Sequence, residues 1–95
     1  MGRIRGQADM SRVTIRYWAA AKEVAGVAEQ AIDAETLAEA LDVVLRERNE
    51  NLRFREVLSF SSFLVDGSPT GHQEPELVLL NDGSEIEVLP PFAGG

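Results

Sequence analysis

Residues 82–95, DGSEIEVLPPFAGG, join a turn, a strand and a tail in one stretch. Asp82-Gly83 is a dipeptide that supplies the positive φ of a tight turn. Residues 85–89 alternate acidic and apolar side chains, which predicts a half-buried strand. Pro90 and Pro91 have no N–H to donate to a sheet, so strand pairing should stop there and the chain should leave extended.

The last two residues, Gly94 and Gly95, have no Cβ and can enter a channel that is too narrow for any other residue. An ordinary domain end does not need such a tail. The ending is explained if the terminal carboxylate of Gly95 is itself the reactive group. We therefore treat residues 90–95 as a flexible tail that the rest of the chain presents.

Composition limits the classes of function. A chain of 95 residues with 44% apolar residues can bury one modest core, which predicts a single domain. Sixteen acidic against nine basic residues give a net charge of −7, which argues against nucleic-acid binding. The absence of cysteine excludes disulfides, thiolate metal sites and a thiol nucleophile. No apolar run is long enough to cross a membrane and no signal peptide is visible, so we expect a cytoplasmic protein.

The first ten residues show no hydrophobic period. We expect residues 1–10 to be a disordered leader or a non-native extension, and residues 11–95 to be the domain. A basic arm with a binding role is the alternative.

A strand is predicted from Val13 to Tyr17, because apolar and polar side chains alternate there. In that phase Trp18 points outward, where either the following loop covers it or a partner contacts it. Residues 19–25 are rich in alanine and suit a short helical turn. A second strand, at about residues 28–33, should pair antiparallel with the first.

The main helix begins at a capping box formed by Thr36 and Glu39. Asn49 to Asn51 should end it. Its apolar positions recur at helical spacing and should form one buried stripe. They are Leu37, Ala40, Leu41, Val44 and Leu45.

The following segments are less regular. Residues 52–60 are ambiguous and could form a short irregular helix. Residues 62–65 are predicted to form a strand with Leu64 outward and an Asp66-Gly67 turn after it. Residues 68–76 read as a loop with a solvated His72, which has no partner at metal-ligand spacing. Residues 77–80 are predicted to be a short apolar strand.

This order of elements predicts an α+β fold, with a mixed sheet of four to five strands crossed by one main helix. A β-grasp (ubiquitin-like) roll satisfies it within this length. There the last strand lies parallel to the first, so that Trp18 and Leu89 could be neighbours. With Phe92 they would form an apolar patch at the root of the tail, and such a patch usually indicates a protein partner.

Two stretches carry a resemblance to a known family. The DG-E-V-PP-AGG pattern of the last stretch and the sequence IRYWAAAKEVAG at residues 15–26 resemble the MoaD/ThiS family of ubiquitin-like sulfur carriers. The resemblance covers about residues 12–95. The Pro-Pro-Phe-Ala-Gly-Gly ending looks most like MoaD, the small subunit of molybdopterin synthase.

The resemblance implies a sulfur carrier for molybdenum cofactor biosynthesis. An E1-like, MoeB-like partner would adenylate the carboxylate of Gly95 with ATP, and a sulfur donor would convert it to a thiocarboxylate. The MoaE-like large subunit of molybdopterin synthase would accept the tail, and the sulfur would pass to cyclic pyranopterin monophosphate.

By the same resemblance, each part of the chain has an expected role. Gly95 bears the sulfur and Gly94 allows passage through the channel. The reach and seating of the tail are set by Pro90, Pro91, Phe92 and Ala93. The docking candidates are Trp18, Leu89, Leu64 and Lys22. We expect no metal and no bound cofactor, since ATP is used by the activating partner, and the catalytic residues should belong to the large subunit.

Three alternatives remain open. The chain could carry sulfur for thiamin, cysteine or tRNA thiolation. It could be a ubiquitin-like modifier that is joined through Gly95 to a lysine of a target. It could also be a plain β-grasp binding module whose Gly-Gly ending is incidental.

Overall fold

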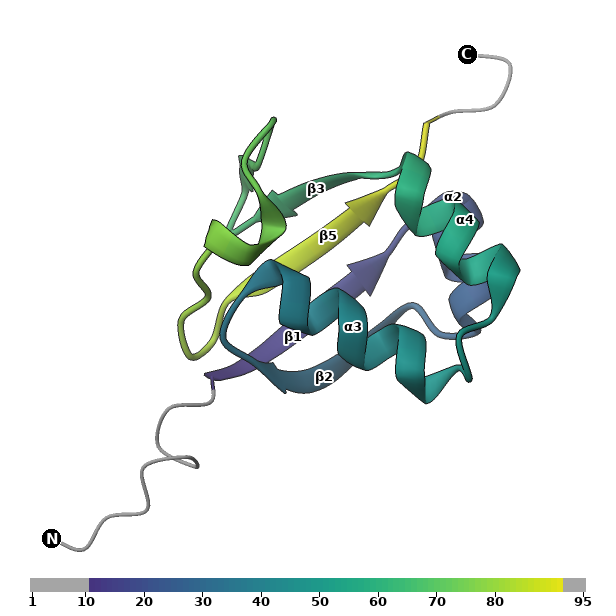
Figure 1. Cartoon of the computed structure of the whole chain (residues 1–95), viewed down its shortest axis with the longest axis horizontal. Coiled ribbons are helices and arrows are strands. Elements are labelled where there is room, and N and C mark those ends of the chain that lie inside the picture. The colour runs from purple at the N-terminus through teal and green to yellow at the C-terminus, as the bar shows by residue number, and fades with distance from the viewer. Residues whose placement is uncertain (1–10, 92–95) are drawn as a thin grey trace, which may run out of the picture.

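Strand β5 (Glu85–Leu89) lies at the centre of a five-stranded mixed sheet (Figure 1). It pairs in parallel with β1 (Ser11–Tyr17) on one side and antiparallel with β3 (Ser62–Val65) on the other. The edges are β2 (Glu29–Ala34), antiparallel to β1, and the two-residue β4 (Ser68–Pro69). The order β2-β1-β5-β3-β4 confirms the predicted mixed sheet and the parallel placement of the last strand beside the first.

The structure is a computed structural model that describes residues 11–91. The predicted leader, residues 1–10, lies outside the described residues. So do Phe92, Ala93, Gly94 and Gly95 of the tail, and with them the predicted contribution of Phe92 to the apolar patch.

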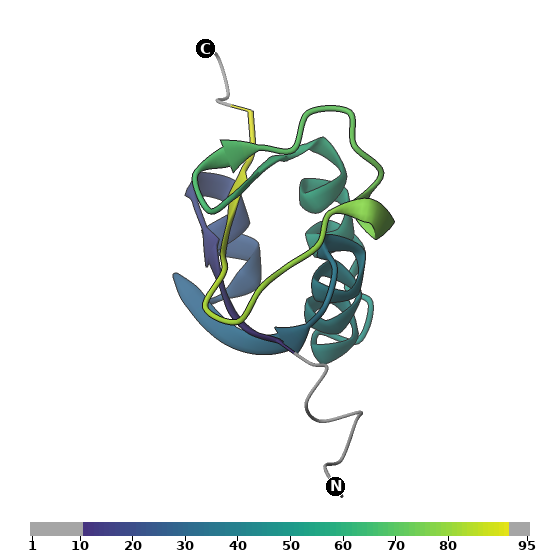
Figure 2. The same ribbon diagram turned by 90° about the vertical axis from the view of Figure 1, so that its left-hand side faces the viewer.

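Helices α3 (Leu37–Glu47) and α4 (Leu52–Phe60) lie on the same side of the sheet, as Figure 2 shows in a view turned by 90°. The shorter α2 (Ala19–Ala25) follows β1 and packs against α4, β1 and β5. The core between helices and sheet comes from alternate strand residues and from one stripe of each helix. Its fully buried larger side chains are Val13, Ile15, Leu37, Val44, Phe54, Ile86 and Val88.

The capping box predicted for α3 is present. The backbone N–H of Glu39 donates to Thr36 Oγ1 at 3.1 Å, and the backbone N–H of Glu35 donates to Glu39 Oε1 at 2.8 Å. The first bond satisfies a donor that the first turn leaves without an intrahelical partner, and the second fixes the residue just before the N-cap Thr36. The helix ends at Glu47, and Asn49 and Glu50 both adopt positive φ, so the predicted stop is confirmed.

The ambiguous residues 52–60 form a regular α-helix, α4. Asn51 caps it, because its Oδ1 accepts from the backbone N–H of Phe54 at 2.9 Å. Phe54 and Leu58, four residues apart, are buried on its inner face. The sequence pattern is weak because this helix contributes only those two residues to the core.

The segment from residue 68 to residue 80 differs from its prediction in two ways. The predicted loop contains β4 at its start and a 3₁₀ turn, η1 (Pro75–Leu77), near its end. The predicted strand at residues 77–80 is wrong. Val78 and Leu80 are buried between exposed neighbours, but they hydrogen-bond to the backbone that enters α3, where only one isolated β-bridge forms. An alternating pattern therefore arose from an extended segment without a sheet partner.

Arg48 closes the core at one end. Its guanidinium lies 4.7 Å from the ring centroid of Phe54 and 5.5 Å from that of Tyr17, which is cation–π geometry. It donates to Gln30 Oε1 at 2.7 Å and to two main-chain carbonyls. The Tyr17 hydroxyl donates to the same Gln30 oxygen at 2.7 Å. Burial raises the pKa of Tyr17 from its ordinary value of 10.0 to about 12, although Arg48 opposes the shift.

We expect the free energy of unfolding to fall between about pH 10 and pH 12 because of Tyr17. The fold favours the neutral phenol, so this contribution is complete below the unfolded pKa of about 10 and is lost as the pH rises through the folded pKa. The loss should approach roughly 2–3 kcal/mol. Urea unfolding at a series of pH values measures it, and tyrosinate absorbance reports Tyr17 alone because the sequence has one tyrosine.

Tyr17→Phe is the control for this prediction. It should lower stability at pH 8, because the hydrogen bond to Gln30 is lost, and it should flatten the decline above pH 10. Equal slopes for the two proteins between pH 10 and pH 12 would contradict the assignment.

Candidate functional site

The parallel pairing of β1 and β5 places the C-terminal ends of these two strands side by side at one end of the sheet. The arrows of β1 and β5 both point to this end of the sheet in Figure 1. Tyr17 and Val88 are the last paired residues in register, so Trp18 and Leu89 follow at the same place. We call this end of the sheet, where the chain continues into Pro90, the tail root.

Strand β5 ends at the tail root as predicted. The backbone N–H of Trp18 donates to the carbonyl of Val88 at 3.2 Å, and Leu89, the last residue of β5, is followed by two prolines. Pro90 has no N–H with which to continue the ladder. Pro90 is buried against the body while Pro91 is exposed, so the chain leaves the fold between them.

Trp18 points outward, as the strand period predicted. Its side chain is 47% exposed and it stands at the N-cap of α2. Its Nε1–H donates to Glu87 Oε1 at 3.1 Å, which ties the ring to the outer face of β5. Because alternate strand residues share a face, Glu87 and Leu89 lie on that outer face.

Leu64 lies on β3, the strand that pairs with β5 on the side away from β1. It lies opposite Glu87 in the β3–β5 register and is half-buried. We call Trp18, Leu64, Glu87 and Leu89 the outward cluster. The fold therefore places three of the predicted docking candidates on one face next to the tail root, with a carboxylate among them.

Lys22, the fourth docking candidate, lies on α2 and is exposed. It lines a shallow groove beside Trp18, to which Val27, 43% exposed, adds an apolar wall. The groove continues the apolar surface of Trp18 away from the sheet.

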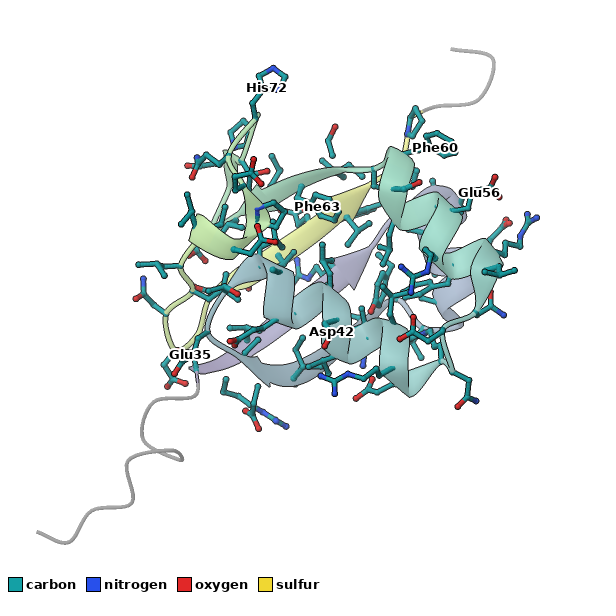
Figure 3. All side chains as sticks on the ribbon, in the orientation of Figure 1. Glu35, Asp42, Glu56, Phe60, Phe63 and His72 are labelled. Atoms are coloured by element: carbon teal, nitrogen blue, oxygen red, sulfur yellow. The ribbon has the colours of Figure 1, made fainter. Side chains whose placement is uncertain are left out.

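Two residues near the tail root were missed by the sequence analysis. Phe60, the last residue of α4, is 66% exposed and lies by the point where the C-terminal strand leaves the body (Figure 3). Assigning residues 52–60 as helix would have found it, because Phe60 falls off the stripe of Phe54 and Leu58. The sequence analysis treated Glu87 only as one of the acidic residues that alternate along the last strand, and its contact with Trp18 depends on the β1–β5 register.

Ion pairs lie on the part of the outer face formed by β1, β2 and the start of β5. Arg12 pairs with Asp33 at 3.3 Å, and Arg16 pairs with Glu29 at 3.1 Å and with Glu85 at 3.9 Å. All five side chains are more than 40% exposed, so each pair contributes little to stability. They make that part of the face polar, whereas Trp18, Leu64 and Leu89 give the outward cluster its apolar character.

Within residues 11–91, no three His, Cys, Asp or Glu side chains gather closely enough to hold a metal ion, and no helix is long and apolar enough to span a membrane. His72 is exposed at the tip of its loop, as predicted (Figure 3). A hollow of about 320 Å³ beneath that loop has no charged side chain among its lining residues. The candidate site consists of the outward cluster and the point where the chain leaves the fold after β5.

Comparisons with known proteins agree with this geometry. The ThiS family model matches residues 15–95. A comparison with curated proteins finds no match.

Solved structures share the fold over most of the chain. Small archaeal modifier protein 1 from Methanosarcina acetivorans has a TM-score of 0.75 at 24% identity, covering 90% of this chain and 98% of that one. The same protein from Haloferax volcanii has a TM-score of 0.71 at 20% identity, with 90% and 100% coverage. A complex of subunits 1 and 2 of molybdopterin-converting factor from Helicobacter pylori gives 0.63 at 26% identity, with 88% and 99% coverage. These likenesses confirm the predicted β-grasp roll.

We expect Trp18→Ala to lower the free energy of unfolding by only about 1 kcal/mol, because half of the side chain is already in water. Phe54→Ala, at a fully buried position, is the matched comparison and should cost about 3–5 kcal/mol. Urea unfolding followed by circular dichroism measures both. A loss for Trp18→Ala as large as that for Phe54→Ala would place Trp18 in the core and remove it from the outward cluster.

Proposed function

The chain belongs to the ThiS family, and from this membership we propose that it is a sulfur carrier whose reactive group is the terminal carboxylate of Gly95. The observation that carries the proposal is that the family match runs through residue 95. The described fold supports it, because β5 ends at a double proline beside an apolar outer surface.

The chemistry explains why the reactive group needs partners. A carboxylate is a poor electrophile, since its charge and resonance oppose nucleophilic attack. We propose that an E1-like, MoeB-like enzyme lets a Gly95 carboxylate oxygen attack the α-phosphate of ATP, which forms an acyl adenylate and releases pyrophosphate. Hydrosulfide, or its equivalent from a sulfur donor, then attacks the carbonyl carbon, AMP leaves and a thiocarboxylate remains.

The folded body serves as a handle in this proposal. Residues 90–95 can span at most about 20 Å, so the reactive atom can enter a site in a partner while the body stays outside. Pro90 and Pro91 limit the conformations of the tail, and Gly94 allows passage through a narrow channel. Phe92 and Ala93 seat the tail. Docking is assigned to Trp18, Leu64, Leu89 and Lys22.

For the acceptor we propose molybdopterin synthase. The Pro-Pro-Phe-Ala-Gly-Gly ending and the likeness to the Helicobacter pylori complex support a MoaE-like large subunit as partner. That subunit would hold the catalytic residues and pass the sulfur to cyclic pyranopterin monophosphate. The chain would bind no cofactor of its own and act in the cytoplasm.

We expect that removing Gly95, or adding an alanine after it, abolishes sulfur acceptance without unfolding the protein. The change displaces the reactive carboxylate but touches no described core residue. Mass spectrometry after incubation with the activating enzyme, ATP and a sulfide source would show the exchange of oxygen for sulfur in the native chain and in neither tail variant. His72→Ala, an exposed loop variant, is the control that should accept sulfur normally. Equal acceptance by the native and extended chains would rule out the proposal.

A second candidate function is protein modification, which the likeness to two small archaeal modifier proteins favours. Both functions would begin with the same activated tail. They differ in the nucleophile that takes it, which is sulfur for a carrier and a lysine amine for a modifier.

Lys22 separates these candidates in a purified system, because it is the one lysine of the sequence. Lys22→Arg keeps the positive charge of this docking candidate, so with the activating enzyme, ATP and sulfide we expect native chain and variant alike to give thiocarboxylate and no isopeptide-linked dimers. Dimers that form with the native chain and disappear in Lys22→Arg would favour the modifier. Gel electrophoresis with peptide mass mapping measures this.

A further inference from the structure

Glu87 occupies an unusual place on the outer face of the sheet. It lies in the outward cluster with Leu64 opposite it on β3 and Leu89 two residues along its own strand. Glu87 is partly buried as a residue, and its Oε1 accepts from Trp18 Nε1–H at 3.1 Å at the surface. An acidic side chain thus stands among three apolar ones at the tail root.

The other carboxylates of this face have cations beside them. Asp33 pairs with Arg12, while Glu29 and Glu85 pair with Arg16. Arg16 is opposite Glu87 in the β1–β5 register, but its guanidinium is engaged by those two other carboxylates. Within residues 11–91, Glu87 has no ion pair, and its hydrogen bond comes from a neutral donor.

This difference matters once a partner covers the outward cluster. A carboxylate that loses its water must be met by a cation or by several donors, or its desolvation opposes binding. The indole N–H supplies one hydrogen bond, while the two carboxylate oxygens can accept about four. A partner surface made only of apolar groups would therefore bind this cluster poorly.

We propose that Glu87 is a specificity residue that receives an arginine side chain of the docking partner, an inference that rests on the proposed carrier function. A guanidinium can reach both carboxylate oxygens with parallel N–H groups, and its flat face can pack on the exposed ring of Trp18. The net charge of −7 also favours approach of a basic surface. The partner that activates the tail should thus present an arginine within an apolar patch.

The test uses the E1-like enzyme from the same genome, with ATP-dependent pyrophosphate exchange as the readout. Glu87→Gln keeps the size of the side chain and a hydrogen-bond acceptor for Trp18 but removes the charge. We expect it to raise the KM for the carrier by at least about tenfold with little change in kcat, and to weaken the dependence of KM on salt. Glu85→Gln is the matched control on the same strand and face, and should stay within about twofold of the native chain. Thermal melting checks that both variants fold.

The outcomes separate the two proposals. If the native chain is adenylated and Glu87→Gln has an unchanged or lower KM, the arginine contact is overturned and the carrier function stands. If Glu85→Gln raises KM as much as Glu87→Gln, the effect is one of overall charge and the specific contact is overturned. If the native chain is not adenylated at all, the carrier function fails and this inference falls with it.

Discussion

The parallel pairing of β1 with β5 is the constraint on which the arrangement of this protein depends. It joins residues 14–17 to residues 85–88 in a fixed register and buries Ile15, Tyr17, Ile86 and Val88 beneath the helices. Because β1 and β5 run in the same direction and end at the same end of the sheet, the chain leaves the fold beside Trp18. The outward cluster and the point where the chain leaves the fold are therefore neighbours, and the proposed docking and tail roles both depend on this arrangement.

Two turn aspartates hold the start of β5 in that register. Asp66 accepts from the backbone N–H of Glu85 at 2.9 Å and from the Ser84 hydroxyl at 3.0 Å. Asp82 accepts from the backbone N–H of Arg12 at 2.8 Å. Both residues belong to Asp-Gly pairs whose role as turns was visible in the sequence. Their side chains also hydrogen-bond to strands that are far away along the chain. The sequence therefore showed the turns, but it did not show that the same aspartates fix the pairing of β5 with its neighbours.

The wrong strand at residues 77–80 and the ambiguity at residues 52–60 have a common physical origin. Alternation at residues 77–80 does occur, with Val78 and Leu80 buried, but the neighbouring backbone enters a helix and offers only one bridge. Residues 52–60 show little periodicity because α4 buries only Phe54 and Leu58. The hydrophobic pattern of a segment indicates which of its side chains are buried. Whether the segment forms a strand also depends on whether another strand lies beside it to accept its hydrogen bonds.

The sequence by itself determined the strands at both ends, the capped helix, the mixed sheet and the double-proline, double-glycine ending, because each depends on local chemistry or on a clear period. It also indicated that Trp18 faces outward, since strand residues alternate. Only the tertiary structure decided that Glu87 contacts Trp18, that Leu64 joins them and that Phe60 lies at the tail root. Those neighbours come from strands and a helix separated by dozens of residues, and the β1–β5 and β3–β5 registers that bring them together are set by packing of the whole core.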